Sequence, residues 1–260
     1  MGVETTKSAD GTVIAYDRAG DGPALIAVTG AFCDRKTFDP PDDLTGAFTV
    51  YTYDRRGRGD SGDTQPYSAD HEVADLAAVI ETAGGSAFCY GHSSGAALVL
   101  RAAAQDAPIT TAVVYEAPYI IPGSREVPAD PAARIRELVA SGRRDDAVRF
   151  WMTEVIQVPA RVVTMMERSP TWPGLEALTH TLPYDLALTG NQGVPAAELA
   201  RITVPVLVMG GGNSPEWFGR TVRETTAAIP GARLQVMAGY DHGIPPEVLA
   251  PVLTEFFLGS

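Results

Sequence analysis

The stretch from Ala87 to Ala104 constrains the fold more than any other part of the chain. An apolar segment, 87–90, is followed by Gly91-His92-Ser93-Ser94-Gly95 and then by an alanine- and leucine-rich segment with helical character. The pattern G-x-S-x-G in this setting predicts a sharp turn from a buried strand into a helix. Because glycine has no Cβ, the two glycines let strand, turn and helix approach closely, while the serine is strained and its hydroxyl is held outward.

Strands and helices alternate on both sides of this turn. Strands are expected at 12–17, 24–28, 48–53, 87–90, 111–115, 204–209 and 234–237, and helices at 68–83, 94–105, 217–229 and 246–257. Such alternation predicts an α/β fold with a mostly parallel, twisted sheet and helices on both faces.

The pattern changes in 121–199, where strand-like segments disappear. We expect this segment to be a helical lid inserted into one domain made of 1–120 and 200–260, since 260 residues suffice for one substantial core. Large apolar side chains lie in the insertion: Trp151, Met152, Met165, Met166 and Trp172. They are equally consistent with lining a cavity for an apolar ligand and with packing the lid onto the sheet.

The composition narrows the class of protein. The net charge of −12 disfavours nucleic-acid binding, which needs a basic surface. We find neither the pattern of a secretory signal nor an apolar run approaching the ~18 residues of a membrane span, and we therefore expect a cytoplasmic protein without membrane contact. Cys33 and Cys89 are too few for a disulfide framework and are expected as small apolar residues.

A serine hydroxyl is a weak nucleophile at neutral pH and needs a base that is itself oriented by a third group. Among the four histidines, His242 is favoured as the base because it follows the last predicted strand. Loops at the carboxyl ends of parallel strands meet at one edge of the sheet, where His242 can approach Ser93. His71 and His180 lie in a helix and in the insertion, and His92 is expected to point away from the serine.

The combined motifs resemble the α/β-hydrolase family. Besides G-x-S-x-G, the chain carries Asp54-x-Arg56-Gly57-x-Gly59-x-Ser61 after the 48–53 strand, and His242-Gly243 before the last helix. The resemblance implies an α/β-hydrolase fold with a nucleophile elbow, the chain order serine, acid, histidine, and chemistry without a metal or organic cofactor. The 54–61 motif is expected to stabilise its own turn rather than to take part in catalysis.

Compared with the family, the acid is the catalytic residue whose position in this chain is unusual. In most of the family the acid follows the next-to-last strand, and here Asn213 stands at about that place. Asparagine has no charge with which to stabilise an imidazolium. Glu216 in the same loop, Asp241 beside the histidine, and a dyad without an acid are the remaining alternatives to the residue that we favour.

That residue is Glu116, which ends the strand after the serine turn. A single right-handed crossover joins it to Ser93, so both belong at the carboxyl edge of adjacent strands. A glutamate there could reach His242. Its other interpretation is a helix cap or a salt-bridge partner.

Two backbone N–H groups are expected to form an oxyanion hole. The resemblance implies one from Ser94, after the nucleophile, and one from the turn after the 24–28 strand, for which we favour Ala31 over its neighbours Gly30 and Phe32.

A narrower resemblance is to the zearalenone lactonases, small α/β-hydrolases with the acid after the same strand. It rests on 91–95, on Tyr115-Glu116-Ala117-Pro118 and on Trp172, which corresponds to a lid tryptophan over the substrate. This resemblance implies hydrolysis of a lactone ester, with Trp172 at the substrate. We therefore expect a carboxylic ester hydrolase or lactonase that acts on an apolar small molecule, and we expect further substrate contacts from Phe32, Trp151 and Met152. The alternative is a non-hydrolytic member (a cyclase, a lyase or a small-molecule binder) using the same pocket. The oligomeric state stays open, a homodimer being one alternative.

Overall fold

In a computed structural model, residues 3–190 and 192–259 are described, and within them the central element is an eight-stranded sheet with the order β1-β2-β4-β3-β5-β6-β7-β8. The strands are β1 (Glu4–Lys7), β2 (Val13–Ala19), β3 (Ala24–Val28), β4 (Thr49–Tyr53), β5 (Ala87–His92), β6 (Ile109–Tyr115), β7 (Val206–Gly211) and β8 (Arg233–Met237). β1 and β2 pair antiparallel with their neighbours, and the strands from β4 to β8 are parallel. The predicted mostly parallel α/β sheet is confirmed.

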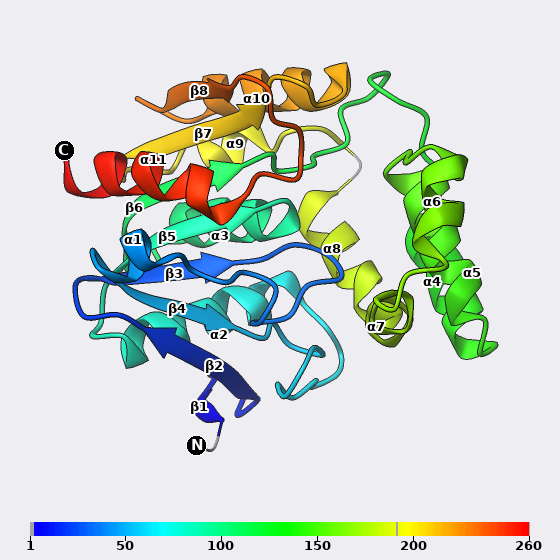
Figure 1. The fold of residues 1–260 in the computed structure, drawn as a ribbon, viewed down its shortest axis with the longest axis horizontal. Coiled ribbons are helices and arrows are strands. Elements are labelled where there is room, and N and C mark those ends of the chain that lie inside the picture. Colours follow the sequence, from blue (N-terminus) through cyan, green and yellow to red (C-terminus); the bar gives the residue numbers. More distant parts are fainter. Residues whose placement is uncertain (1–2, 191, 260) are drawn as a thin grey trace.

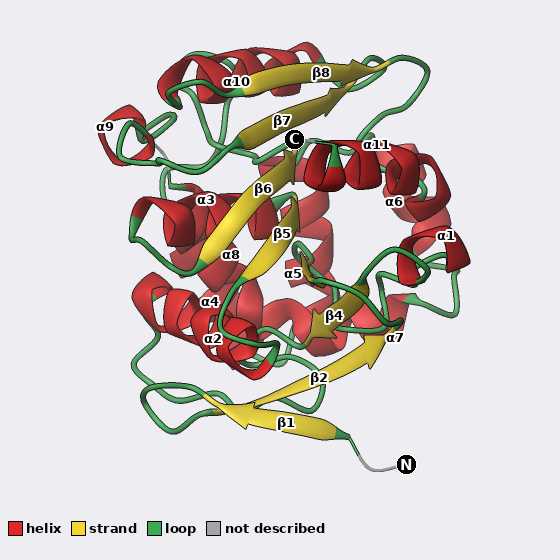
Figure 2. Cartoon of the chain, turned by 90° about the vertical axis from the view of Figure 1, so that its left-hand side faces the viewer, coloured by secondary structure: helices red, strands yellow, loops and turns green. Residues whose placement is uncertain are grey.

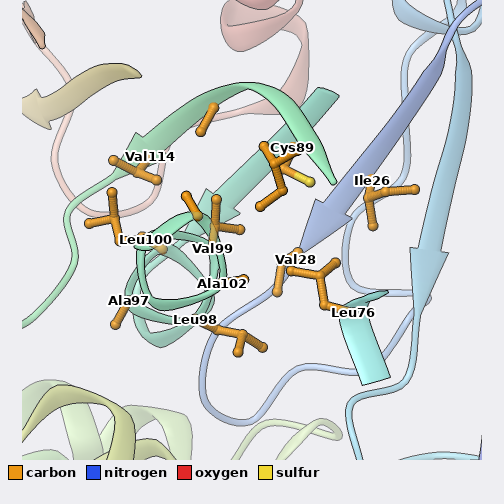
Figure 3. Close-up of a cluster of buried hydrophobic side chains, with 14 of the residues drawn as sticks. Ile26, Val28, Leu76, Cys89, Ala97, Leu98, Val99, Leu100, Ala102 and Val114 are labelled. Atoms are coloured by element: carbon orange, nitrogen blue, oxygen red, sulfur yellow. The ribbon is translucent and has the colours of Figure 1, made fainter. Parts of the chain in front are cut away.

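Helices cover both faces of the sheet (Figure 2). One face carries α2 (Ala69–Thr82), α3 (Ser94–Ala104), α9 (Ala196–Leu199) and α10 (Glu216–Ala228), and the other carries α1 (Asp42–Thr45) and α11 (Pro246–Leu258). Two clusters of buried apolar side chains correspond to these faces. Figure 3 shows the first, in which Leu98 and Val99 of α3 pack with Val28, Cys89 and Val114 of the strands.

The chain between β6 and β7 is helical. It contains α4 (Pro131–Ala140), α5 (Arg144–Phe150), the π-helical turn η1 (Trp151–Val155), α6 (Ala160–Met166), α7 (Trp172–Leu178), the 3₁₀ turn η2 (Thr179–Thr181) and α8 (Leu182–Thr189). In Figure 1, α4 to α7 stand beyond the end of the sheet to which the parallel strands point, and α8 returns to pack on α3. The insertion therefore faces the edge at which the candidate residues were expected. No helix in 3–190 or 192–259 is long and apolar enough to cross a membrane.

Candidate active site

Ser93 lies in the turn between β5 and α3 with φ of 57° and ψ of −126°. This left-handed conformation strains any residue other than glycine. The turn is also too tight for a Cβ on either flanking glycine. A Cβ on Gly91 would lie 2.7 Å from the Cα of Ala96, and one on Gly95 would lie 2.2 Å from the carbonyl oxygen of Val28. The pentapeptide therefore forms the strained turn that its glycines predict.

β6 brings Glu116 to the same edge, beside His242. The Glu116 Oε2 accepts a hydrogen bond from His242 Nδ1 at 2.6 Å, and Oε1 accepts one from the N–H of Gly211 at 2.8 Å. The carboxylate is 1% exposed, and Glu116 itself has a positive φ of 49°. With Nδ1–H facing the carboxylate, Nε2 of His242 is left as the proton acceptor.

The other acid candidates lie elsewhere. Glu216 begins α10, and Asp241 is exposed, with its Oδ1 accepting the N–H of Gly243 at 2.9 Å. Asn213 lines the cavity described below and donates its N–H to the carbonyl oxygen of Tyr240 at 2.8 Å. Within the described residues, Glu116 is the carboxylate that contacts His242.

Sequence reasoning missed three residues that surround His242. Nε2 of His92 donates to the carbonyl oxygen of His242 at 2.9 Å, and the hydroxyl of Tyr115 donates to the carbonyl oxygen of Asp241 at 2.6 Å. The ring of Phe218 stacks on His242 with a centroid distance of 4.6 Å. Burial, helped by the nearby His242, lowers the pKa of His92 to about 3, so its ring is neutral and its N–H can donate. No motif signals these contacts, because they join residues far apart in the chain.

The expected oxyanion donors lie next to Ser93. Across 3–190 and 192–259, the N–H groups of Ala31, Phe32 and Ser94 have no recorded acceptor. Ser94 begins α3, where N–H groups have no partner within the helix. Gly30 packs directly on the serine, since a Cβ there would lie 2.7 Å from the Ser93 Cβ.

A cavity of about 420 Å³ opens at this site. Ser93 and His242 lie in its wall, and so do Phe32 and Trp151, whose rings meet edge to face at 6.3 Å. Its other large apolar side chains come from the loop after β6, the insertion and α10: Ile120, Val155, Ile156, Val158, Leu186, Trp217 and Phe218. The site is therefore a largely apolar pocket beside a serine and a histidine.

Two residues expected at the substrate lie elsewhere. Met152 and Trp172 are 5% and 6% exposed and belong to the apolar cluster that holds the insertion together, not to the cavity wall. Met152 follows Trp151 on a helical turn, where adjacent side chains diverge, so only Trp151 faces the cavity. Met152 and Trp172 therefore pack in the core of the insertion and do not line the cavity.

A buried ionic cluster ties the insertion to the serine turn. Oδ1 of Asp185, on α8, lies 2.9 Å from Arg55, 2.8 Å from Arg58 and 2.6 Å from the hydroxyl of Ser94. Arg55 also binds Glu72 through two hydrogen bonds of 2.6 and 2.8 Å. All of these side chains are at most 2% exposed. The loop with the 54–61 motif thus contacts α8 as well as stabilising its own turn.

Comparisons with known proteins show the family to which this fold belongs. Residues 25–251 match the profile described as the Alpha/beta hydrolase family. The crystal structure of an alpha/beta hydrolase from Sphaerobacter thermophilus superposes with a TM-score of 0.93 at 49% identity, covering 98% of this chain and 100% of that one.

Two curated relatives are hydrolytic enzymes by name. The 2-(acetamidomethylene)succinate hydrolase of Mesorhizobium japonicum is 27% identical over 91% of this chain and 88% of its own length. The N-formylmaleamate deformylase of Pseudomonas putida is 37% identical over 42% of this chain and 43% of its own. These relatives support an enzyme of the hydrolase class. The match runs from the first parallel strand to the last helix, and it includes the strained turn between strand and helix that carries the serine. This chain therefore belongs to the alpha/beta hydrolase family.

Proposed function

We propose that the protein is a serine hydrolase that cleaves an ester or lactone of an apolar small molecule through an acyl-enzyme. The observation that carries the proposal is the 2.6 Å contact between Glu116 and His242 at the sheet edge that also holds the strained Ser93. A buried carboxylate on Nδ1 fixes the histidine tautomer and stabilises the imidazolium that forms during catalysis.

In the proposed reaction, Nε2 of His242 takes the proton of Ser93 as Oγ attacks the substrate carbonyl carbon. The N–H groups of Ala31 and Ser94 stabilise the oxyanion, each contributing roughly 3–4 kcal/mol of transition-state stabilisation. The leaving alkoxide takes the proton from His242. A water molecule then loses a proton to His242 and attacks the acyl-serine, which releases the acid and restores the hydroxyl.

The walls of the cavity and the relatives support different parts of this proposal. The apolar wall suits a hydrocarbon-rich substrate. The resemblance to zearalenone lactonases supports a lactone through the serine turn and the position of Glu116, whereas Trp172 adds nothing because it lies in the core of the insertion. The words acetamido and N-formyl in the relatives' names denote acyl groups on nitrogen, so an amide bond is the second candidate.

A fluorophosphonate probe tests the proposal directly. We expect the folded protein to be labelled at Ser93, Ser93→Ala to remain unlabelled, and Ser141→Ala, at the exposed end of α4, to label like the wild type. An unlabelled, folded wild type would contradict the proposal and favour a non-hydrolytic member of the family. A screen of aryl esters, macrocyclic lactones and N-acyl compounds then identifies the scissile bond.

A further inference from the structure

One charged side chain in the cavity wall has no counter-charge. Arg125 lies in the loop between β6 and α4, and its Nη1 donates to the carbonyl oxygen of Val155. Its guanidinium carbon stands 4.0 Å from the ring centroid of Trp217, and its buried Nε has no acceptor among residues 3–190 and 192–259. Burial lowers the pKa of Arg125 to about 10, with no ionised neighbour in the described chain to offset the effect. The side chain is therefore a protonated, partly desolvated cation at neutral pH.

The other charges around the cavity are already balanced or exposed. Four of them form the neutral buried cluster described above: Asp185, Glu72, Arg55 and Arg58. Glu116 faces His242, and Asp241 is exposed to solvent. In the described part of the chain, no carboxylate makes an ion pair with Arg125.

Desolvating a guanidinium without an anion costs free energy, and a ligand that supplies the anion offsets that cost. We propose that Arg125 binds a free carboxylate of the substrate, which makes the substrate class an ester, lactone or amide that also carries a carboxylate. This inference rests on the proposed function for the bond that is cleaved. The planar guanidinium matches a carboxylate in shape and charge, whereas a phosphate monoester would bring nearly two negative charges to one cation.

The aromatic residues of α10 set the spacing between the two ends of such a substrate. Trp217, under Arg125, stacks on Phe218 at 3.7 Å, and Phe218 stacks on His242 at 4.6 Å. Three successive contacts thus separate the cation from the histidine. A carboxylate at Arg125 and a carbonyl at Ser93 would then lie at opposite ends of the molecule, with an apolar body between them along the cavity wall.

Matched esters that differ in charge test this inference. The probes are the monomethyl and dimethyl esters of straight-chain dicarboxylic acids from succinate to suberate. Their binding to Ser93→Ala is measured by isothermal titration calorimetry, and their hydrolysis by the protein with Ser93 intact is followed in a pH-stat. We expect the monoester of the best length to bind at least about 10-fold more tightly than its diester, as a charge-assisted hydrogen bond implies.

Substitutions of Arg125 test whether the preference for the monoester depends on this side chain. Adding Arg125→Gln should remove it, and Arg125→Lys should retain part of it, because the lysine keeps the charge but not the planar fork. Arg136→Gln is the matched control, since Arg136 is exposed on α4 and shares only a neighbouring pocket with Arg125, outside the wall that contains Ser93 and His242. Circular dichroism checks that each variant is folded. If Arg125→Gln is unfolded, the inference is tested by the reduced preference expected of Arg125→Lys and by the preference of Ser93→Ala itself for the monoester.

The outcomes separate this inference from the proposed function. Equal binding of the two esters to Ser93→Ala, a preference that survives Arg125→Gln, or an equal loss in Arg136→Gln would overturn carboxylate recognition. If the preference depends on Arg125 but neither ester is hydrolysed and Ser93 does not react with the fluorophosphonate, the recognition stands and the hydrolase proposal fails. If both esters are hydrolysed without preference, the hydrolase proposal stands and carboxylate recognition fails.

Discussion

His92 holds the backbone of His242 in place. Its Nε2 lies 2.9 Å from the carbonyl oxygen of His242, and the two rings are 4.7 Å apart. Because burial lowers its pKa to about 3, His92 is a neutral donor at neutral pH. It fixes the loop that carries His242 and, being neutral, does not compete with Nε2 of that residue for the proton of Ser93.

Replacing His92 with phenylalanine should therefore impair catalysis more than folding. His92→Phe keeps a ring of similar size and loses the N–H that binds the carbonyl of His242. We expect kcat to fall about 10-fold with little change in KM, which corresponds to about 1.4 kcal/mol for one lost hydrogen bond. The pH profile of kcat/KM should also shift, which a purely structural role would not cause. His71→Phe, in α2, serves as the control and should leave both kcat and the profile unchanged.

The same substitution should change how stability depends on pH. The folded-state pKa of about 3 lies below the ordinary value of 6.5, so between these values the unfolded chain binds a proton at this site and the folded chain does not. The contribution of His92 to the free energy of unfolding is complete above pH 6.5. It falls by about 1.4 kcal/mol for each pH unit on acidification toward pH 3. Urea unfolding at several pH values should show this slope in the wild type and its loss in His92→Phe; parallel curves for the two proteins would contradict the assignment.

Glu116 and Glu216 are distinguished by a pair of isosteric substitutions. Glu116→Gln removes the charge that would stabilise the His242 imidazolium and leaves an amide facing two N–H donors, Nδ1–H and the N–H of Gly211. We expect turnover to fall at least about 100-fold. Glu216→Gln, at the start of α10, should change turnover little. The opposite ranking of kcat in steady-state assays would show that the acid lies after β7.

Three glycine-to-alanine substitutions should have three different results. A Cβ on Gly30 would meet the side chain of Ser93, with Oγ 3.2 Å away, so activity should fall more than 10-fold with a smaller loss of stability. At Gly95 the Cβ would lie 2.2 Å from a backbone oxygen, so folding itself should suffer. Gly174, in α7, has open space, and alanine there should stabilise the helix by about 0.5–1 kcal/mol. Thermal unfolding and activity measured on the same samples check all three.

Asp185→Asn tests the buried ionic cluster. Removing this charge leaves Arg58 without its acidic partner and Arg55 with only Glu72, both out of contact with water. We expect the free energy of unfolding to fall by about 3–5 kcal/mol, as is typical when one member of a buried pair is lost. Glu137→Gln breaks an exposed pair with Arg134 and should cost less than about 1 kcal/mol in the same denaturant titration.

The sequence predicts those parts of this molecule that depend on local pattern and chain order. The serine turn follows from its glycines, and the position of Glu116 at the same edge of the sheet follows from the single crossover between β5 and β6. β1 was missed because Glu4–Lys7 is short, polar and mostly exposed, so its pairing with β2 has no apolar pattern. The contact of Asp185 with Arg55 and Arg58 could not be inferred, because more than 120 residues separate the partners.

The direction in which a residue of the insertion faces was not predictable either. Trp151 and Met152 are neighbours that both belong to the apolar cluster of the insertion, yet of the two only Trp151 also lines the cavity. That difference is set by the orientation of the π-helical turn relative to the sheet, which composition and spacing do not determine.

The end of β7, which leads into the loop with Asn213, holds Glu116 with its main chain rather than with a side chain. Gly211 donates its N–H to Glu116, and a Cβ there would lie 2.6 Å from the carbonyl oxygen of Tyr240. The backbone conformation at this point must therefore be preserved, whereas the side chain of Asn213 is not needed to orient His242. A motif search that requires a carboxylate at this point would classify the chain as lacking an acid, and would discard it as a degenerate relative although its histidine has a carboxylate partner.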